Sequence, residues 1–265
     1  MSNRVRPVAI LCATGLVAAA VGCGSDPDPE PNEGDPGGDG GVAESPTVIE
    51  LAAAKLVVEH DATDDDTGFR GFVDGQPWNR MIIEGTDGEP VVSVKANGRL
   101  SSFGLTELAF TTSEPRGDEV TLATVLGRLP PGEYGFTGQT VGGDTLAGVA
   151  TLSHTIPAGP VIIAPVEPGV RVDPAVQFRW SPVTTDVSGQ PTVEITHYQL
   201  VVERLDQPPT AGFARERLDV TLPATVRAFA VPGGFFQRGS NYRFEVVAID
   251  IGGNQTITSG EFLAR

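Results

Sequence analysis

The six consecutive residues from Asp61 to Asp66 carry four carboxylates, a residue type that binds cations. The four are Asp61, Asp64, Asp65 and Asp66. Hard cations such as Ca²⁺ bind several carboxylate and carbonyl oxygens on one bent loop, and an ion relieves the repulsion among those carboxylates. The EF-hand pattern is not matched, because position 63 is Thr and the sixth position is not Gly. Two predictions stay open for this segment: a Ca²⁺-binding loop and a solvated acidic turn.

No catalytic residue is predicted. The three histidines, His60, His154 and His197, do not have metal-ligand spacing, and H-E-x-x-H, G-x-S-x-G and Walker motifs are all absent from the sequence. Cysteine occurs only at positions 12 and 23, so residues 24–265 offer no thiol nucleophile, zinc–thiolate site or disulfide. We therefore expect a protein that is not an enzyme and has no cofactor other than the Ca²⁺ considered above.

Cys23 is a candidate for lipidation. Arg4 and Arg6 precede an apolar run over residues 8–21, which is the pattern of a secretory signal and is short for a membrane span. The run ends in Ala20-Val21-Gly22-Cys23, which resembles a bacterial lipobox. That resemblance implies a signal peptide over residues 1–22 and acylation of Cys23, with palmitate-type chains that anchor the protein to a membrane. A soluble exported protein or a short anchor helix is the alternative.

Residues 23–46 predict a disordered tether. Of residues 24–46, eleven are Gly or Pro, seven are acidic and none is basic. Such a segment cannot offset the conformational entropy of ordering, so it acts as a spacer. The whole chain has a formal charge of −16, from 18 basic and 34 acidic residues. This charge argues against nucleic acid as a partner, because phosphate binding requires clustered Lys and Arg.

Residues 47–157 predict a β-rich domain of unknown function. Asp74-Gly75, Asp87-Gly88 and Asn97-Gly98 are turn signals between β-prone segments. Leu122, Val125, Leu126 and Leu129 have helical spacing, so we expect one short helix, with Asp118 and Glu119 at its start. The segment predicts a β-sandwich-like domain with this helix. It also looks like a module found ahead of immunoglobulin-like domains in bacterial secreted proteins, a likeness that implies no known activity.

Residues 158–265 alternate apolar and polar side chains with the period of half-buried strands. Val176, Phe178 and Trp180 alternate with polar neighbours, and the segment Gly239 to Ala248 reads G-x-x-Y-x-F-x-V-x-A. This pattern, with Trp180, Tyr198 and Tyr242, resembles a fibronectin type III domain. The resemblance implies structural roles for these three aromatic residues, including a bond from the Tyr242 hydroxyl to the preceding loop.

The predicted fold class is therefore all-β, with two β-sandwich-like domains after a signal peptide and a disordered linker. The function that follows is a non-catalytic, lipid-anchored protein of the cell envelope, at the outer membrane or cell surface. Its sandwiches present surfaces to a protein or a polysaccharide. A carbohydrate- or wall-binding module is the alternative, for which the aromatic candidates are Trp78 and Phe235-Phe236. An exported hydrolase is less favoured.

Overall fold

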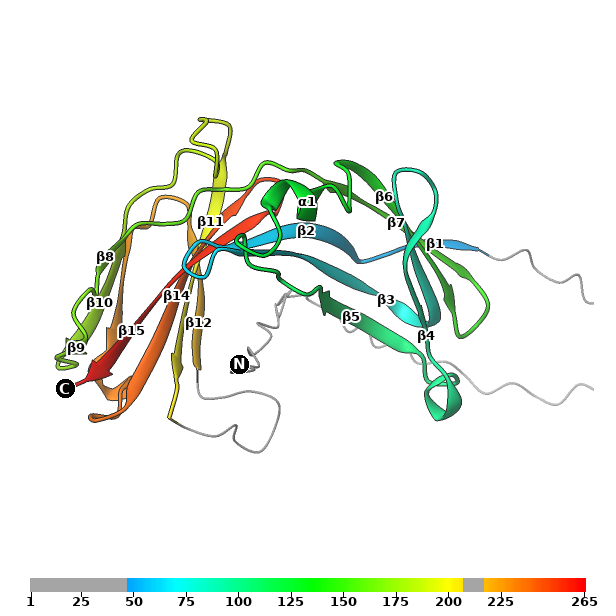
Figure 1. Ribbon diagram of the computed structural model, residues 1–265. Coiled ribbons are helices and arrows are strands. Elements are labelled where there is room, and N and C mark those ends of the chain that lie inside the picture. The colour runs from blue at the N-terminus through cyan, green and yellow to red at the C-terminus, as the bar shows by residue number, and fades with distance from the viewer. Residues whose placement is uncertain (1–46, 207–216) are drawn as a thin grey trace, which may run out of the picture. The chain divides into compact units, whose positions relative to one another are not determined.

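The computed structural model describes residues 47–206 and 217–265 (Figure 1). From Val48 onward the described residues form one compact unit that is almost entirely β-strand, so the predicted all-β class is correct. Two hydrophobic clusters fill it, one drawn from residues 51–156 and one from residues 172–264. The predicted domain boundary near residue 157 lies between these clusters and stays a prediction. The predicted signal peptide, Cys23 and the tether lie outside the described residues.

Seven strands, one α-helix and one 3₁₀ turn build the N-terminal half. In the main sheet β1, β7, β6, β3 and β2 are neighbours in that order, and β4 and β5 also pair with β3. The bounds are β1 (Val48–Glu50), β2 (Ala53–Asp61), β3 (Asp66–Glu84), β4 (Pro90–Lys95), η1 (Gly98–Leu100), β5 (Leu105–Thr111), α1 (Leu122–Leu126), β6 (Gly132–Thr140) and β7 (Thr145–Leu152).

Strand β3 changes partners halfway along its length. Its first part pairs with β2 and β5, and its last part pairs with β4 and β6, with a register shift between Asp74 and Trp78. The turn predicted at Asp74-Gly75 is therefore wrong, because the strand bends there and continues. Gly75 serves close packing instead, since a Cβ on it would lie 2.8 Å from the side chain of Leu51. Through this irregularity β3 joins β2 and β5 to β4 and β6 within one hydrogen-bonded sheet.

The remaining turn and helix signals of this half are largely confirmed. Gly88 lies in the β3–β4 turn with φ of 80°, a conformation that glycine adopts at little cost. The predicted short helix is α1, and Val125 on its apolar face is buried. The helix begins after Thr121, whose hydroxyl accepts a hydrogen bond from the Thr124 amide at 3.3 Å, and not at Asp118 and Glu119 as predicted.

Eight strands and one 3₁₀ turn build the C-terminal half. One sheet has the order β13-β10-β8, and the facing sheet has the order β15-β14-β11-β12, with β9 beside β15. The bounds are β8 (Ile162–Ala164), β9 (Gly169–Val170), β10 (Ala175–Trp180), β11 (Ile195–Arg204), β12 (Arg217–Pro223), β13 (Ala228–Pro232), η2 (Gly233–Phe235), β14 (Asn241–Asp250) and β15 (Gln255–Ala264). Three strands facing four is the arrangement expected for a fibronectin type III-like sandwich.

Aromatic side chains fill the space between these two sheets. The rings of Phe178 and Phe244, from opposite sheets, meet edge to face with centroids 5.2 Å apart. Trp180 and Tyr198 pack with centroids 5.6 Å apart, and Phe262 stacks on Tyr242. Such ring pairs add about 0.5–1.5 kcal/mol each beyond their area burial. The alternation of β10 thus places its apolar side chains in this core, as the sequence predicts.

Strand β15 joins the two halves (red in Figure 1). It pairs antiparallel with β14 along its length, and Gln255 to Ile257 pair in parallel with Glu59 to Asp61 of β2. A single hydrogen-bonded sheet therefore passes from one hydrophobic cluster to the other.

Candidate functional site

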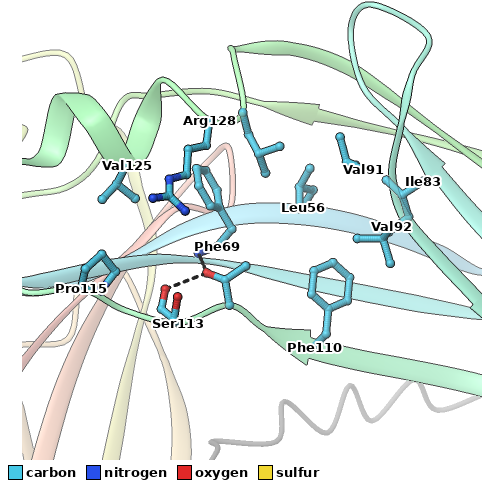
Figure 2. Close-up of a pocket in the computed structure, with 12 residues that line it drawn as sticks. Leu56, Phe69, Ile83, Val91, Val92, Phe110, Ser113, Pro115, Val125 and Arg128 are labelled. Atoms are coloured by element: carbon cyan, nitrogen blue, oxygen red, sulfur yellow. Dashed lines mark hydrogen bonds between the residues drawn. The ribbon is translucent and has the colours of Figure 1, made fainter. Parts of the chain in front are cut away.

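A pocket of about 210 Å³ opens in the N-terminal half beside the helix α1. Most of its walls are apolar side chains from strands β2 to β5 and from the α1 segment (Figure 2). The strand β3 contributes from both of its parts, so its change of partners helps to shape the pocket. The lining residues are Leu56, Phe69, Ile83, Val91, Val92, Phe110, Thr112, Ser113, Pro115, Val125, Arg128 and Leu129.

Arg128 supplies the only charge in the pocket lining. Arg128 follows α1 and is exposed. Its guanidinium is directed toward Val125 and Phe69 (Figure 2). Arg128 has no hydrogen bond or ion pair within the part of the chain that the structure describes. The pocket therefore combines an apolar interior with one cation whose donors are available to a ligand.

Two residues with hydroxyl side chains, Thr112 and Ser113, line the pocket. Thr112 Oγ1 accepts a hydrogen bond from the Phe69 amide at 2.9 Å and donates to the Ser113 carbonyl at 3.1 Å. No histidine, aspartate or glutamate is among the lining residues. Activation of a hydroxyl nucleophile needs an adjacent base, and the described lining supplies none.

None of the three histidines is among the residues that line the pocket, although His154 contacts one of them. His60 Nδ1 is 2.9 Å from the hydroxyl of Thr67, and His154 Nε2 is 2.9 Å from the carbonyl oxygen of Leu129. His197 is exposed on β11, as its position in the strand predicts. Each ring thus has a local role or faces solvent.

The acidic segment forms the turn between β2 and β3. Asp61 and Asp66 pair across the ends of these strands and are buried, and Asp61 Oδ1 accepts hydrogen bonds from the amides of Thr63 and Asp64. Asp65 adopts φ of 52°. No group of three or more His, Cys, Asp or Glu side chains suited to a metal ion occurs within residues 47–206 and 217–265. Binding of Ca²⁺ by this turn stays a prediction.

The aromatic residues considered for carbohydrate binding do not form a surface platform. Trp78 is completely buried, with an exposed fraction of 0%, because it packs in the N-terminal hydrophobic cluster. Phe236 is buried and Phe235 is half-buried, and their rings pack against each other at 5.1 Å. The prediction that these residues are exposed for stacking on sugars is wrong.

The three aromatic residues assigned structural roles all lie in the C-terminal core. The Tyr242 hydroxyl accepts a hydrogen bond from the Gln237 amide at 2.8 Å, in the loop before β14. The Tyr198 hydroxyl accepts one from the Val183 amide at 2.9 Å. Trp180 is buried, and its indole N–H has no hydrogen-bond partner among the described residues.

Asn254 connects the two halves and was not singled out for this role from the sequence. Its side-chain oxygen accepts from the Val58 amide at 2.8 Å, and its side-chain nitrogen donates to Ser153 and to the Thr155 carbonyl oxygen, the latter at 2.8 Å. The residue is buried. No local pattern around Asn254 marks a partner that lies 196 residues away in the sequence.

Carboxylates gather beside this junction. Arg70 and Gln255 both bond to the carboxylate of Glu59, and burial raises the pKa of Glu245. The charges of Asp61, Glu59 and Glu203 add to that rise, and Arg243 opposes it. Of these acidic side chains, Glu59 is held by an arginine and an amide partner.

No helix in the described ranges is long and apolar enough to cross a membrane. No protein-family model and no curated protein matches the chain.

Solved structures show likeness at low sequence identity. The FN1-FN3 domains of chicken CNTN1 match 83% of this chain and 66% of theirs, with 10% identity and a TM-score of 0.31. A two-domain fibronectin type III segment of chicken tenascin matches 83% of this chain and 99% of its own, with 10% identity and a TM-score of 0.28.

A tetra-tandem repeat from the extending region of a large adhesion protein matches 80% of this chain and 50% of its own, with 14% identity and a TM-score of 0.27. The chain thus spans less than two thirds of the length of this repeat protein and of the CNTN1 fragment. TM-scores this low do not establish a shared architecture for the whole chain, so the fibronectin type III-like description of the C-terminal half relies on its strand order.

Proposed function

We propose that this protein is an exported, non-catalytic interaction module of the cell envelope, anchored by a lipid at Cys23. The sequence supports the anchor through the basic start, the apolar run and the lipobox-like residues that end at Cys23. The outer membrane or the cell surface is the proposed location. The interaction surfaces are those of the folded unit from Val48 onward.

The pocket beside α1 carries the proposal of binding without catalysis. Its walls are apolar, its only charge is Arg128, and its hydroxyls have no base within the lining. A binding pocket of this kind orients a ligand with a few polar groups and holds it by apolar burial. We assign the pocket to a small apolar molecule that carries one negative group, with that group at Arg128.

The volume limits the size of this ligand. At about 210 Å³ the pocket lies below the usual range of about 300–1,000 Å³ for ligand pockets, so it takes a small ligand. That space accommodates one ring or a chain of similar size. A ligand this small gains little total energy, so a Kd of about 1 mM, equivalent to about −4 kcal/mol, is the expected range.

Calorimetric titration with octanoate and with its uncharged analogue octanol tests the assignment. All described strands follow residue 47, so the chain 24–265 retains the folded unit and is the material to use. We expect octanoate to bind, with Arg128→Gln weakening it about fivefold, a modest effect because the guanidinium is exposed. The same substitution should leave octanol unaffected.

Two further variants make the titration decisive. Val92→Trp fills the pocket and should abolish binding of both probes, while Arg80→Gln, an exposed arginine outside the lining, should change neither. Circular dichroism checks that each variant is folded. Equal octanoate affinity in wild type, Arg128→Gln and Val92→Trp would overturn the assignment.

Lipidation is tested separately in cells that take up radiolabelled palmitate. The wild type should incorporate label and fractionate with membranes, and Cys23→Ser should do neither. Cys12→Ser, within the predicted signal peptide, is the matched control and should behave as the wild type. Unlabelled wild-type protein in the aqueous fraction would contradict the proposed anchor.

A carbohydrate-binding module is not carried forward, because the three aromatic residues it requires are buried or half-buried.

A further inference from the structure

The loop between β4 and β5 exposes large apolar side chains at its tip. Phe103 is 79% exposed and Leu100 is 56% exposed, and every residue from Asn97 to Phe103 is exposed. Figure 1 shows this loop projecting beyond the ends of β4 and β5. Phe103 is thus placed where it contributes nothing to either hydrophobic cluster.

Backbone hydrogen bonds within the loop order its tip. The amides of Phe103 and Gly104 both donate to the Leu100 carbonyl, at 3.2 and 2.9 Å, and the Ser101 amide donates to the Gly98 carbonyl at 3.2 Å. Gly104 adopts φ of 76° and lies against Pro77. These hydrogen bonds lower the desolvation cost that the paired amides would otherwise add when the tip enters an apolar medium.

The same segment is basic within a strongly acidic chain. Residues 90–106 include Lys95 and Arg99 and contain no Asp or Glu, whereas the whole chain has a formal charge of −16. Both basic side chains are exposed, and neither has a hydrogen bond or ion pair among the described residues. Exposed apolar residues beside basic ones are the combination that inserts into the interface of an anionic bilayer.

We infer that the loop Asn97–Phe103 inserts Leu100 and Phe103 into the interface of an anionic lipid bilayer, with Lys95 and Arg99 at the headgroups. A lipid surface fits better than a protein groove because the tip is convex and joins cations to apolar groups. This contact requires neither the pocket nor a lipid at Cys23. In a tethered molecule it would fix the orientation of the folded unit, since the anchor raises its effective concentration.

Vesicle binding by the chain 24–265, which lacks Cys23, tests this inference apart from the proposed lipidation. We expect sedimentation with phosphatidylglycerol vesicles, weak sedimentation with phosphatidylcholine vesicles, and loss of binding at high salt. The double variant Leu100→Ser/Phe103→Ser should bind phosphatidylglycerol at least about tenfold more weakly. The control Val161→Ser/Ile163→Ser removes apolar residues that are also exposed, on β8 and just before it, and should bind as the wild type.

A site-specific probe locates the contact. Residues 24–265 contain no cysteine, so Ser102→Cys provides a single site for an environment-sensitive dye, and Ser188→Cys provides an exposed site elsewhere. Anionic vesicles should shift the emission of the dye at position 102 and leave the dye at position 188 unchanged. Equal vesicle binding by the two double variants, no binding by any form, or crosslinking of position 102 only to a protein in intact cells would overturn the inference.

Discussion

The two hydrophobic clusters of this molecule are built differently. The C-terminal cluster packs rings from two facing sheets and includes five phenylalanine or tyrosine side chains within ring-contact distance of one another. The N-terminal cluster surrounds a strand, β3, that passes between partners, and it leaves a pocket of about 210 Å³ at its side. The first arrangement suits a closed scaffold, and the second leaves room for a ligand.

The largest expected effect compares one phenylalanine from each cluster. Phe244→Ala should destabilise by about 4 kcal/mol, because it leaves a cavity in a closed core. Phe69→Ala should cost about 2 kcal/mol, because Phe69 already borders a pocket and its removal enlarges an existing space. Urea denaturation measures both losses. A larger loss at Phe69 would show that the N-terminal cluster is the more tightly packed one.

Asn254→Ala tests whether the two clusters unfold together. The substitution leaves the Val58 amide and the Thr155 carbonyl without their partners, at about 1–3 kcal/mol for each buried group. We expect the free energy of unfolding to fall by about 3 to 4 kcal/mol. The wild type should unfold in a single transition and the Asn254→Ala variant in two. Asn241→Ala, at an exposed position in β14, is the control. Unchanged cooperativity in the Asn254 variant would show that the β2–β15 pairing alone joins the halves.

Asp250, at the same junction, should give stability a pH dependence. Burial raises its pKa to about 6, against the hydrogen bonds that the amides of the turn donate to it, and its buried Oδ1 has no partner among the described residues. The folded state therefore favours the protonated form. Stability contributed by this group is full below its ordinary pKa of 3.8 and is lost as the pH rises through about 6.

Asp250→Asn removes this dependence. At 1.36 kcal/mol per pH unit, the variant should be more stable than wild type by up to about 3 kcal/mol at pH 7.5 and of equal stability near pH 3. Denaturant midpoints at the two pH values provide the measurement. A variant that is less stable at pH 7.5 would mean that the carboxylate is ionised and held in the folded protein.

The smallest expected effect compares tyrosine hydroxyls of the two halves. Tyr242→Phe removes the acceptor of the Gln237 amide, and Tyr134→Phe removes the donor to the Pro130 carbonyl. Each should cost about 1 kcal/mol, the usual net value of one hydrogen bond. Thermal unfolding of the two variants measures the difference. If Tyr242→Phe lowers the free energy of unfolding several times more than Tyr134→Phe does, the Tyr242 hydroxyl stabilises more of the loop before β14 than its one bond to Gln237.

The contrast between the clusters also explains which features the sequence predicts. Period-two alternation is sufficient to predict β10, because one face of this strand is buried and the other is exposed along most of its length. The same alternation does not predict β3. There Gly75 packs closely on Leu51 in place of a turn, and the backbone at Trp78 pairs with both β5 and β6. A change of partners within one strand has no local signature.

The pocket and the junction could not be predicted for a related reason. Leu56 and Arg128 line the same pocket although they are far apart in sequence, and neither has a distinctive neighbour pattern. Asn254 bonds to Val58 across a separation of 196 residues. Contacts of this kind depend on how β2 and β15 pair, which periodicity does not specify. The absence of Asp and Glu from residues 90–106 is visible in the sequence. Only the structure shows that Leu100 and Phe103 are exposed at the tip of this loop.

An NMR titration of the chain 24–265 with octanoate tests the central claim, that the N-terminal half carries a binding pocket and the C-terminal half is closed. Shifted amides should cluster in β2, β4, β5 and the segment around Arg128, and those of residues 172–264 should stay in place. Shifts concentrated in the C-terminal sandwich, or no shifts at saturating octanoate, would contradict the account.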